Sequence, residues 1–132
     1  MRIFIFTLSA LIGFFLLLCC RSKPVAERPE VVSISRVIDK TSRDSELCRS
    51  FTLSKENVAT YFLLANEVDA SDFDQEAMIL PCKYQGTLKK SGHLYQWEII
   101  AGGAGYLYDT KVDKRFICRE KCLDALPNVR GP

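Results

Sequence analysis

The sequence predicts a single α+β domain, in which one main helix packs on a small antiparallel β meander cross-linked by disulfides. Three observations lead to this fold class. Apolar residues recur at helical spacing in 54–66, they alternate with polar residues from 82 onward, and four cysteines lie between 48 and 122. A chain of 132 residues leaves room for one domain of about 100 residues after an N-terminal leader.

The first residues are predicted to be an export signal. Arg2 is followed by an almost unbroken apolar run from Ile3 to Leu18, and the chain becomes polar after Cys19 and Cys20. A charged start, an apolar run and a sharp polar boundary are typical of a secretory signal peptide. The run is shorter than the roughly 20 residues that a spanning helix needs, so an uncleaved anchor is the weaker alternative. We therefore expect residues 1–19 to be removed on export.

The boundary resembles a bacterial lipobox, in which a cysteine after a short apolar stretch is acylated and becomes the mature N-terminus. Leu17-Leu18-Cys19-Cys20 fits this pattern with Cys20 as the modified residue, and acylation of Cys19 is the alternative. Arg21, rather than Asp, after the modified cysteine resembles lipoproteins sent to the outer membrane. The resemblance implies a protein that is anchored in the cell envelope by its N-terminal lipid and faces the periplasm.

A tether and a strand are expected next. Residues 20–30 contain prolines and charged side chains with almost nothing to bury, which predicts a polar tether before a domain spanning 31–132. Val31–Ile38 is rich in β-branched residues and alternates in part, so it predicts a strand whose partner stays open. Asp39–Glu46 is a polar connection.

The main helix is predicted to begin after Ser54, whose hydroxyl suits an N-cap, with Glu56 in the first turn. It is expected to end near residue 66. Ser71 and its neighbours could cap a second short helical turn over Gln75–Met78, which Pro81 would stop. The apolar face of the main helix consists of Val58, Tyr61, Phe62 and Ala65.

From Cys82 the period changes to two, which predicts half-buried strands. In the second of them Tyr95, Trp97 and Ile99 share one face, and Gln96 lies on the other. A hairpin turn at 90–93, a glycine-rich break at 101–105 and a turn at 109–113 separate the elements. The expected strands are 82–89, 94–100, 106–108 and 114–118.

The four cysteines beyond the leader, Cys48, Cys82, Cys118 and Cys122, predict two disulfides in an exported domain. A four-thiolate zinc site is the disfavoured alternative, because the spacing lacks two close CxxC pairs. Cys82 begins the first meander strand and Cys118 ends the fourth, about 14 Å apart, so a bond between them is disfavoured. Cys48–Cys82 with Cys118–Cys122, and Cys48–Cys118 with Cys82–Cys122, both remain open.

Composition and motifs argue against several function classes. The net charge of +2 gives no basic surface for nucleic acid. His93 is the only histidine and has neither a nucleophile nor a second ligand beside it, so we expect no catalytic site, no metal and no cofactor. Two clusters of charge, one acidic and one basic, are expected to be solvated surfaces. These clusters are Glu67, Asp69, Asp72, Asp74 and Glu76, and Lys111, Lys114, Arg115, Arg119 and Lys121.

A partner-binding surface is the remaining candidate, because aromatic side chains flank the glycine-rich segment Ala101–Gly105. Packing in the core is the favoured alternative for these residues. The segment lacks the GxGxxG spacing and opens no helix, so it predicts no phosphate site. The candidate residues are Trp97, Gly102, Gly103, Gly105, Tyr106 and Tyr108.

The domain also resembles small bacterial envelope proteins, in its Pro81-Cys82 pair, its hairpin through Trp97, its Ala-Gly-Gly loop and its terminal Cys-x-x-x-Cys. That resemblance implies a binding protein rather than an enzyme, such as an immunity protein or inhibitor that neutralises a toxin or hydrolase. A structural or assembly lipoprotein of an envelope or secretion complex is the alternative. Ser91–Tyr95 separately resembles the SGxxY element of lipoprotein inhibitors of C-type lysozyme.

Overall fold

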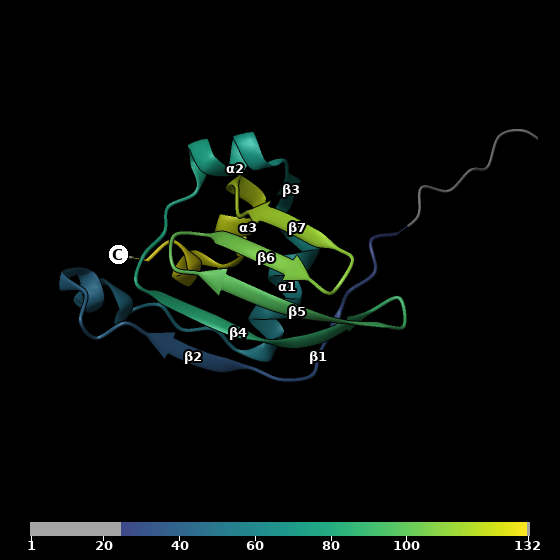
Figure 1. The fold of residues 1–132 in the computed structure, drawn as a ribbon, viewed down its shortest axis with the longest axis horizontal. Helices are drawn as coiled ribbons and strands as arrows, with labels where there is room; N and C mark the ends of the chain where they lie inside the picture. The colour runs from purple at the N-terminus through teal and green to yellow at the C-terminus, as the bar shows by residue number, and fades with distance from the viewer. Residues whose placement is uncertain (1–24, 132) are drawn as a thin grey trace, which may run out of the picture.

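The computed structural model describes residues 25–131. Within them the chain forms a seven-stranded antiparallel sheet in the order β1-β4-β5-β6-β7-β3, with β2 also paired to β4 (Figure 1). The expected α+β class is confirmed. The sheet consists of β1 (Glu30–Val31), β2 (Ser35–Ile38), β3 (Asn66–Val68), β4 (Cys82–Lys90), β5 (His93–Ile100), β6 (Ala104–Tyr108) and β7 (Asp113–Ile117). The helices are α1 (Lys55–Leu64), α2 (Ala70–Glu76) and α3 (Glu120–Ala125), with 3-10 turns η1 (Arg43–Cys48) and η2 (Pro127–Val129).

The helix α1 begins where the sequence predicts and lies behind the sheet in Figure 1. The Ser54 hydroxyl accepts a hydrogen bond from the Asn57 N–H, and the Asn57 side chain accepts one from the Ser54 N–H, which forms a capping box. The expected apolar face packs on the inner side of the meander. There the Phe62 ring lies edge-on to Trp97 and Phe116. This layer of helix on sheet forms the main core.

A β-bulge interrupts the predicted strand Val31–Ile38. The N–H groups of Val32 and Ser33 both donate to the Thr87 carbonyl, at 2.9 and 3.2 Å. The bulge shifts the register by one residue, so Val31 and Ile34 both turn to the core although they are three residues apart. This explains why the alternation in the sequence is only partial. The partner that the sequence left open is β4.

The second helix differs from its prediction in position. It spans Ala70–Glu76 rather than Gln75–Met78, and Asp69, not Ser71, caps it by accepting from the Asp72 N–H at 2.8 Å. Asp and Ser are similarly good N-caps, so local sequence alone did not separate the two starts. The sequence also missed β3, which pairs with β7, and the short helix α3.

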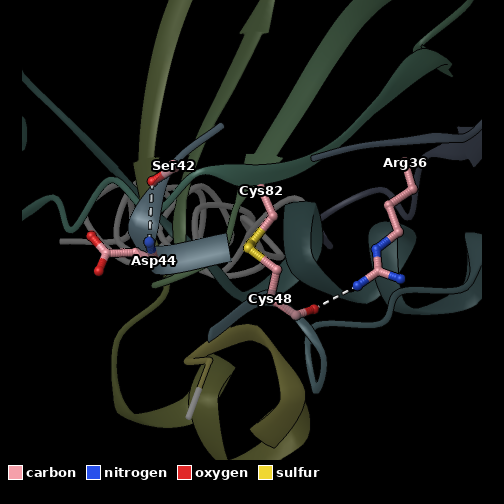
Figure 2. The surroundings of a disulfide bond; sticks show 5 residues. All are labelled: Arg36, Ser42, Asp44, Cys48 and Cys82. Atoms are coloured by element: carbon pink, nitrogen blue, oxygen red, sulfur yellow. Dashed lines mark hydrogen bonds between the residues drawn. A yellow bond between two sulfur atoms is a disulfide. The ribbon is translucent and has the colours of Figure 1, made fainter. Parts of the chain in front are cut away.

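The disulfides are Cys48–Cys82 and Cys118–Cys122, which is one of the two pairings that remained open. The first bridge joins η1 to the start of β4 (Figure 2). Beside it the Arg36 guanidinium donates to the Cys48 carbonyl. The second bridge joins the end of β7 to α3, so each bridge fixes a segment outside the meander to one of its strands.

Part of the expected tether lies against the domain. Glu27 accepts hydrogen bonds from the N–H and hydroxyl of Ser91, and Arg28 forms an ion pair with Glu56 at 2.9 Å. Pro29 is buried, and β1 begins directly after it. Contacts with the domain therefore extend to Glu27, within the segment predicted as tether.

Candidate functional site

The outer face of the sheet, opposite α1, is covered only in part. Phe73 of α2 packs there on Ile100, Ala104 and Ile117, which form a second apolar cluster. The centroid of the Phe73 ring lies 5.0 Å from that of Tyr106. Helix α2 therefore covers the end of the sheet near the β5–β6 turn. Among the described residues, the half near the β4–β5 turn stays open to solvent.

Alternate residues of three neighbouring strands face outward on this open half. The register places Thr87 of β4 opposite Gln96 of β5, and Gln96 opposite Tyr108 of β6. Amide, hydroxyl and phenol groups thus lie in one row across the strands. We name this surface the Tyr108 face, and it consists of Gln85, Thr87, Gln96, Tyr106 and Tyr108.

Three adjoining hollows meet at Tyr108, which lines all of them. The largest, of about 550 Å³, extends to Leu94 and Asp109 near the β4–β5 turn. The second, of about 410 Å³, lies against Glu98, and the third, of about 230 Å³, lies against Ser35. Together they form a broad hollowed surface rather than one enclosed cleft. Such a surface suits a protein partner better than a small molecule, which favours a deep, largely enclosed site.

The electrostatics of the Tyr108 face favour neutral hydrogen bonding. Burial raises the pKa of the Tyr106 phenol, Arg115 opposes this rise, and Glu98 and Asp113 add to it. The phenol therefore stays protonated at neutral pH and can donate to a partner. Lys83 forms an ion pair with Glu98 at 2.7 Å, so that carboxylate is already compensated beside the face.

Of the predicted partner-binding residues, the structure brings only Tyr106 and Tyr108 together on an open surface. Trp97 is fully buried on the opposite side of β5. Its Nε1 is the one buried side-chain nitrogen or oxygen among residues 25–131 that lacks a hydrogen-bond partner. Gly103 and Gly105 are buried as well. A partner on the Tyr108 face would therefore contact the two tyrosines and not the indole.

The glycine-rich segment is packed against its neighbours. The Tyr61 hydroxyl donates to the Gly103 carbonyl at 2.8 Å, and a Cβ at Gly105 would lie 2.5 Å from the same hydroxyl oxygen. Gly102 has a φ of +106°, and a Cβ there would lie 2.8 Å from the Met78 carbonyl oxygen. These glycines permit close approach of neighbouring segments.

The two charge clusters approach each other in the fold. Lys114 of β7 pairs with Glu67 of β3 at 3.3 Å, and the Arg119 Nε donates to Glu76 at 3.0 Å. The Arg119 side chain lowers the pKa of the Glu76 carboxyl through these hydrogen bonds. The clusters thus hold β3 and α2 against the end of the meander.

His93, the histidine that the sequence analysis considered, is exposed at the β4–β5 turn.

The sequence had already predicted that Gln96 lies on the face away from Trp97, and the same alternation places Gln85 and Thr87 outward in β4. It did not single them out as a site. Their role depends on the register of β6, which sets Tyr106 and Tyr108 beside them. No local pattern in the sequence encodes that register.

Within residues 25–131, no group of three or more His, Cys, Asp or Glu side chains is arranged to hold a metal ion. In the same range no helix has the length and apolar character needed to cross a bilayer. The predicted lipidation residue Cys20 and the signal peptide at 1–19 lie outside the described residues.

No family model matches the chain, and no curated protein or solved structure shows significant similarity to it.

Proposed function

We propose that this protein is a non-catalytic binding protein of the bacterial cell envelope, and that it recognises a protein partner through the Tyr108 face. The observation that carries the proposal is the row of outward amide, hydroxyl and phenol groups around three hollows that meet at Tyr108. Tyrosine provides large contact area with few rotatable bonds and is enriched at the centres of protein interfaces.

The proposed location in the cell envelope rests on the leader and on the cysteines. The lipobox-like boundary supports acylation of Cys20 and a periplasm-facing position, with Arg21 favouring the outer membrane. Two disulfides suit an oxidising compartment, where small domains gain stability from cross-links. Within this class we favour an immunity protein or inhibitor that neutralises a toxin or hydrolase. An assembly lipoprotein of an envelope complex, or an inhibitor of C-type lysozyme, is the alternative.

Site-specific photocrosslinking in cells tests the binding face. A crosslinking amino acid at Gln96, on the Tyr108 face, is compared with one at Lys121, which is exposed on α3. Crosslinks from position 96 alone, to a toxin or hydrolase, support the proposal. Crosslinks from both positions, or from position 121 alone, contradict the proposal that the Tyr108 face is the binding surface. Crosslinks from position 96 to envelope machinery alone contradict the inhibitor class and favour an assembly lipoprotein. A crosslink from position 96 to a C-type lysozyme favours the lysozyme inhibitor.

A substitution tests the contribution of the central tyrosine to affinity. Tyr108→Ala is expected to weaken binding of the captured partner by about 30-fold, as for a central interface residue worth about 2 kcal/mol. Tyr84→Ala, whose ring lies on the inner side of β4 and lines none of the three hollows, serves as the aromatic control. Isothermal titration of the purified partner provides the comparison. Equal losses in the two variants would show that the tyrosine acts through folding only.

A further inference from the structure

The chain enters the domain at one end of the sheet. Glu27 accepts two hydrogen bonds from Ser91, at 3.3 Å from its N–H and 2.7 Å from its hydroxyl, and Ser91 forms the β4–β5 turn. In Figure 1 the described chain begins on the same side as this turn, and the C-terminus lies on the opposite side. The N-terminal attachment point is therefore beside the β4–β5 turn.

The distance from a membrane anchor to this point is short. The six residues Arg21–Ala26 separate Cys20 from Glu27, and even a fully extended chain of this length reaches only about 25 Å. The nine residues of β4 span about 30 Å from this end of the sheet to the other. If the opposite end lay on the bilayer, Glu27 would stand about 30 Å above it and out of reach.

The end beside the attachment point carries side chains that fit a lipid surface. Leu94 is 56% exposed although it is a large apolar residue. Lys89 and His93 flank it on the hairpin, and Lys111 projects from the neighbouring β6–β7 turn, all of them exposed. Two carboxylates lie at the same end, and both already accept hydrogen bonds within the domain: Glu27 from Ser91, and Asp109 from the N–H groups of Lys111 and Val112. An exposed leucine flanked by lysines is the pattern of a surface that places its apolar group at the headgroup boundary and its cations at lipid phosphates.

We propose that this end, which we name the hairpin tip and define as Lys89–Leu94 with Lys111, rests on the surface of an anionic bilayer. The inference rests on the proposed membrane anchor at Cys20. It holds the strands upright, with the Tyr108 face directly above the headgroups and Leu94 at its lower edge. The partner that fits this arrangement is a protein that acts at the membrane surface.

The molecule offers a matched control for this surface. Met78 is also a large apolar side chain, 57% exposed, but it lies beside Gly102 at the opposite end of the sheet. The Leu94→Trp and Met78→Trp variants therefore place one indole at each end with nearly equal exposure. Trp97 is the only native tryptophan and is fully buried, so it adds the same background to both.

The full chain, expressed with its own leader and purified from membranes, is reconstituted into vesicles of phosphatidylethanolamine and phosphatidylglycerol that contain brominated lipid. We expect several-fold stronger quenching of the added indole in Leu94→Trp than in Met78→Trp. Replacing phosphatidylglycerol by phosphatidylcholine should reduce that difference, because Lys89 and Lys111 lose their anionic partners.

Equal quenching in the two variants, or stronger quenching in Met78→Trp, overturns the hairpin-tip proposal. If the difference in quenching is the same with and without phosphatidylglycerol, the proposed preference for anionic lipid is wrong. Intact mass of the same preparation reports the acyl group and so tests the anchor separately. If the chain is acylated and quenching is equal in the two variants, the hairpin-tip proposal is wrong while the proposed anchor at Cys20 stands. A chain without an acyl group that fails to stay with the vesicles refutes both.

Discussion

Removing the two disulfides one at a time is expected to destabilise the domain by unequal amounts. The Cys48–Cys82 bridge closes a loop with a sequence separation of 34, whereas Cys118–Cys122 has a separation of 4. The loss of loop-closure entropy from the unfolded chain corresponds to about 4 kcal/mol for the first loop and about 2 kcal/mol for the second. The difference of about 2 kcal/mol is the quantity to measure.

The two double variants, Cys48→Ala with Cys82→Ala and Cys118→Ala with Cys122→Ala, are matched. All four sulfurs are buried, so the cavities left by their removal are similar and largely cancel in the comparison. Urea unfolding under non-oxidising, non-reducing conditions, followed by the fluorescence of the single Trp97, reports the free energy of unfolding.

The variant without Cys48–Cys82 should be the less stable, with a melting temperature about 10 °C below that of the other variant. Equal losses, or a larger loss for Cys118–Cys122, would refute the argument from loop length. Such a result would mean that native contacts of the cross-linked segments, rather than the entropy of the unfolded chain, dominate.

Two further predictions concern single contacts. Gly105→Ala should lower the free energy of unfolding by about 1 to 3 kcal/mol, because its Cβ would meet the hydroxyl oxygen of the buried Tyr61 at 2.5 Å and two carbons of its ring at 2.8 and 2.9 Å. A Gly105→Ala variant that melts like the parent would contradict the contact. The pKa of Glu76 should lie below 4.5 in a carbon-detected NMR titration, because Arg119 donates hydrogen bonds to its carboxylate, and Arg119→Gln should return it toward that value. Since the folded pKa is the lower one, this pair stabilises the domain above pH 4.5 and its contribution is lost as the pH falls through the folded pKa.

Local sequence predicted the elements whose signals lie within a few residues. Ser54 begins the main helix because a hydroxyl can satisfy a free N–H at a helix start. The meander from Cys82 onward was predicted because alternate side chains of a strand point to opposite faces. The strand at 31–38 was recognised but not its bulge, since a bulge depends on two N–H groups sharing the Thr87 carbonyl of a distant strand.

Elements that depend on distant partners were missed or left open. Strand β3 has three residues and exists because β7 pairs with it. The pairing of Cys48 with Cys82 was one of two possibilities until the path of η1 was known. Asp69 and Ser71 were both adequate caps, and the packing of Phe73 on the sheet favours the start that Asp69 gives.

The candidate site shows the same division. The sequence by itself determined which residues of each strand share a face, because that alternation follows from the covalent geometry of an extended chain. It also determined that Tyr106 and Tyr108 share a face of β6. Only the tertiary structure decided that this face is open while the face carrying Trp97 is covered by α1. The physical reason is that side-chain direction is a local property, whereas exposure depends on which distant element packs on each side of the sheet.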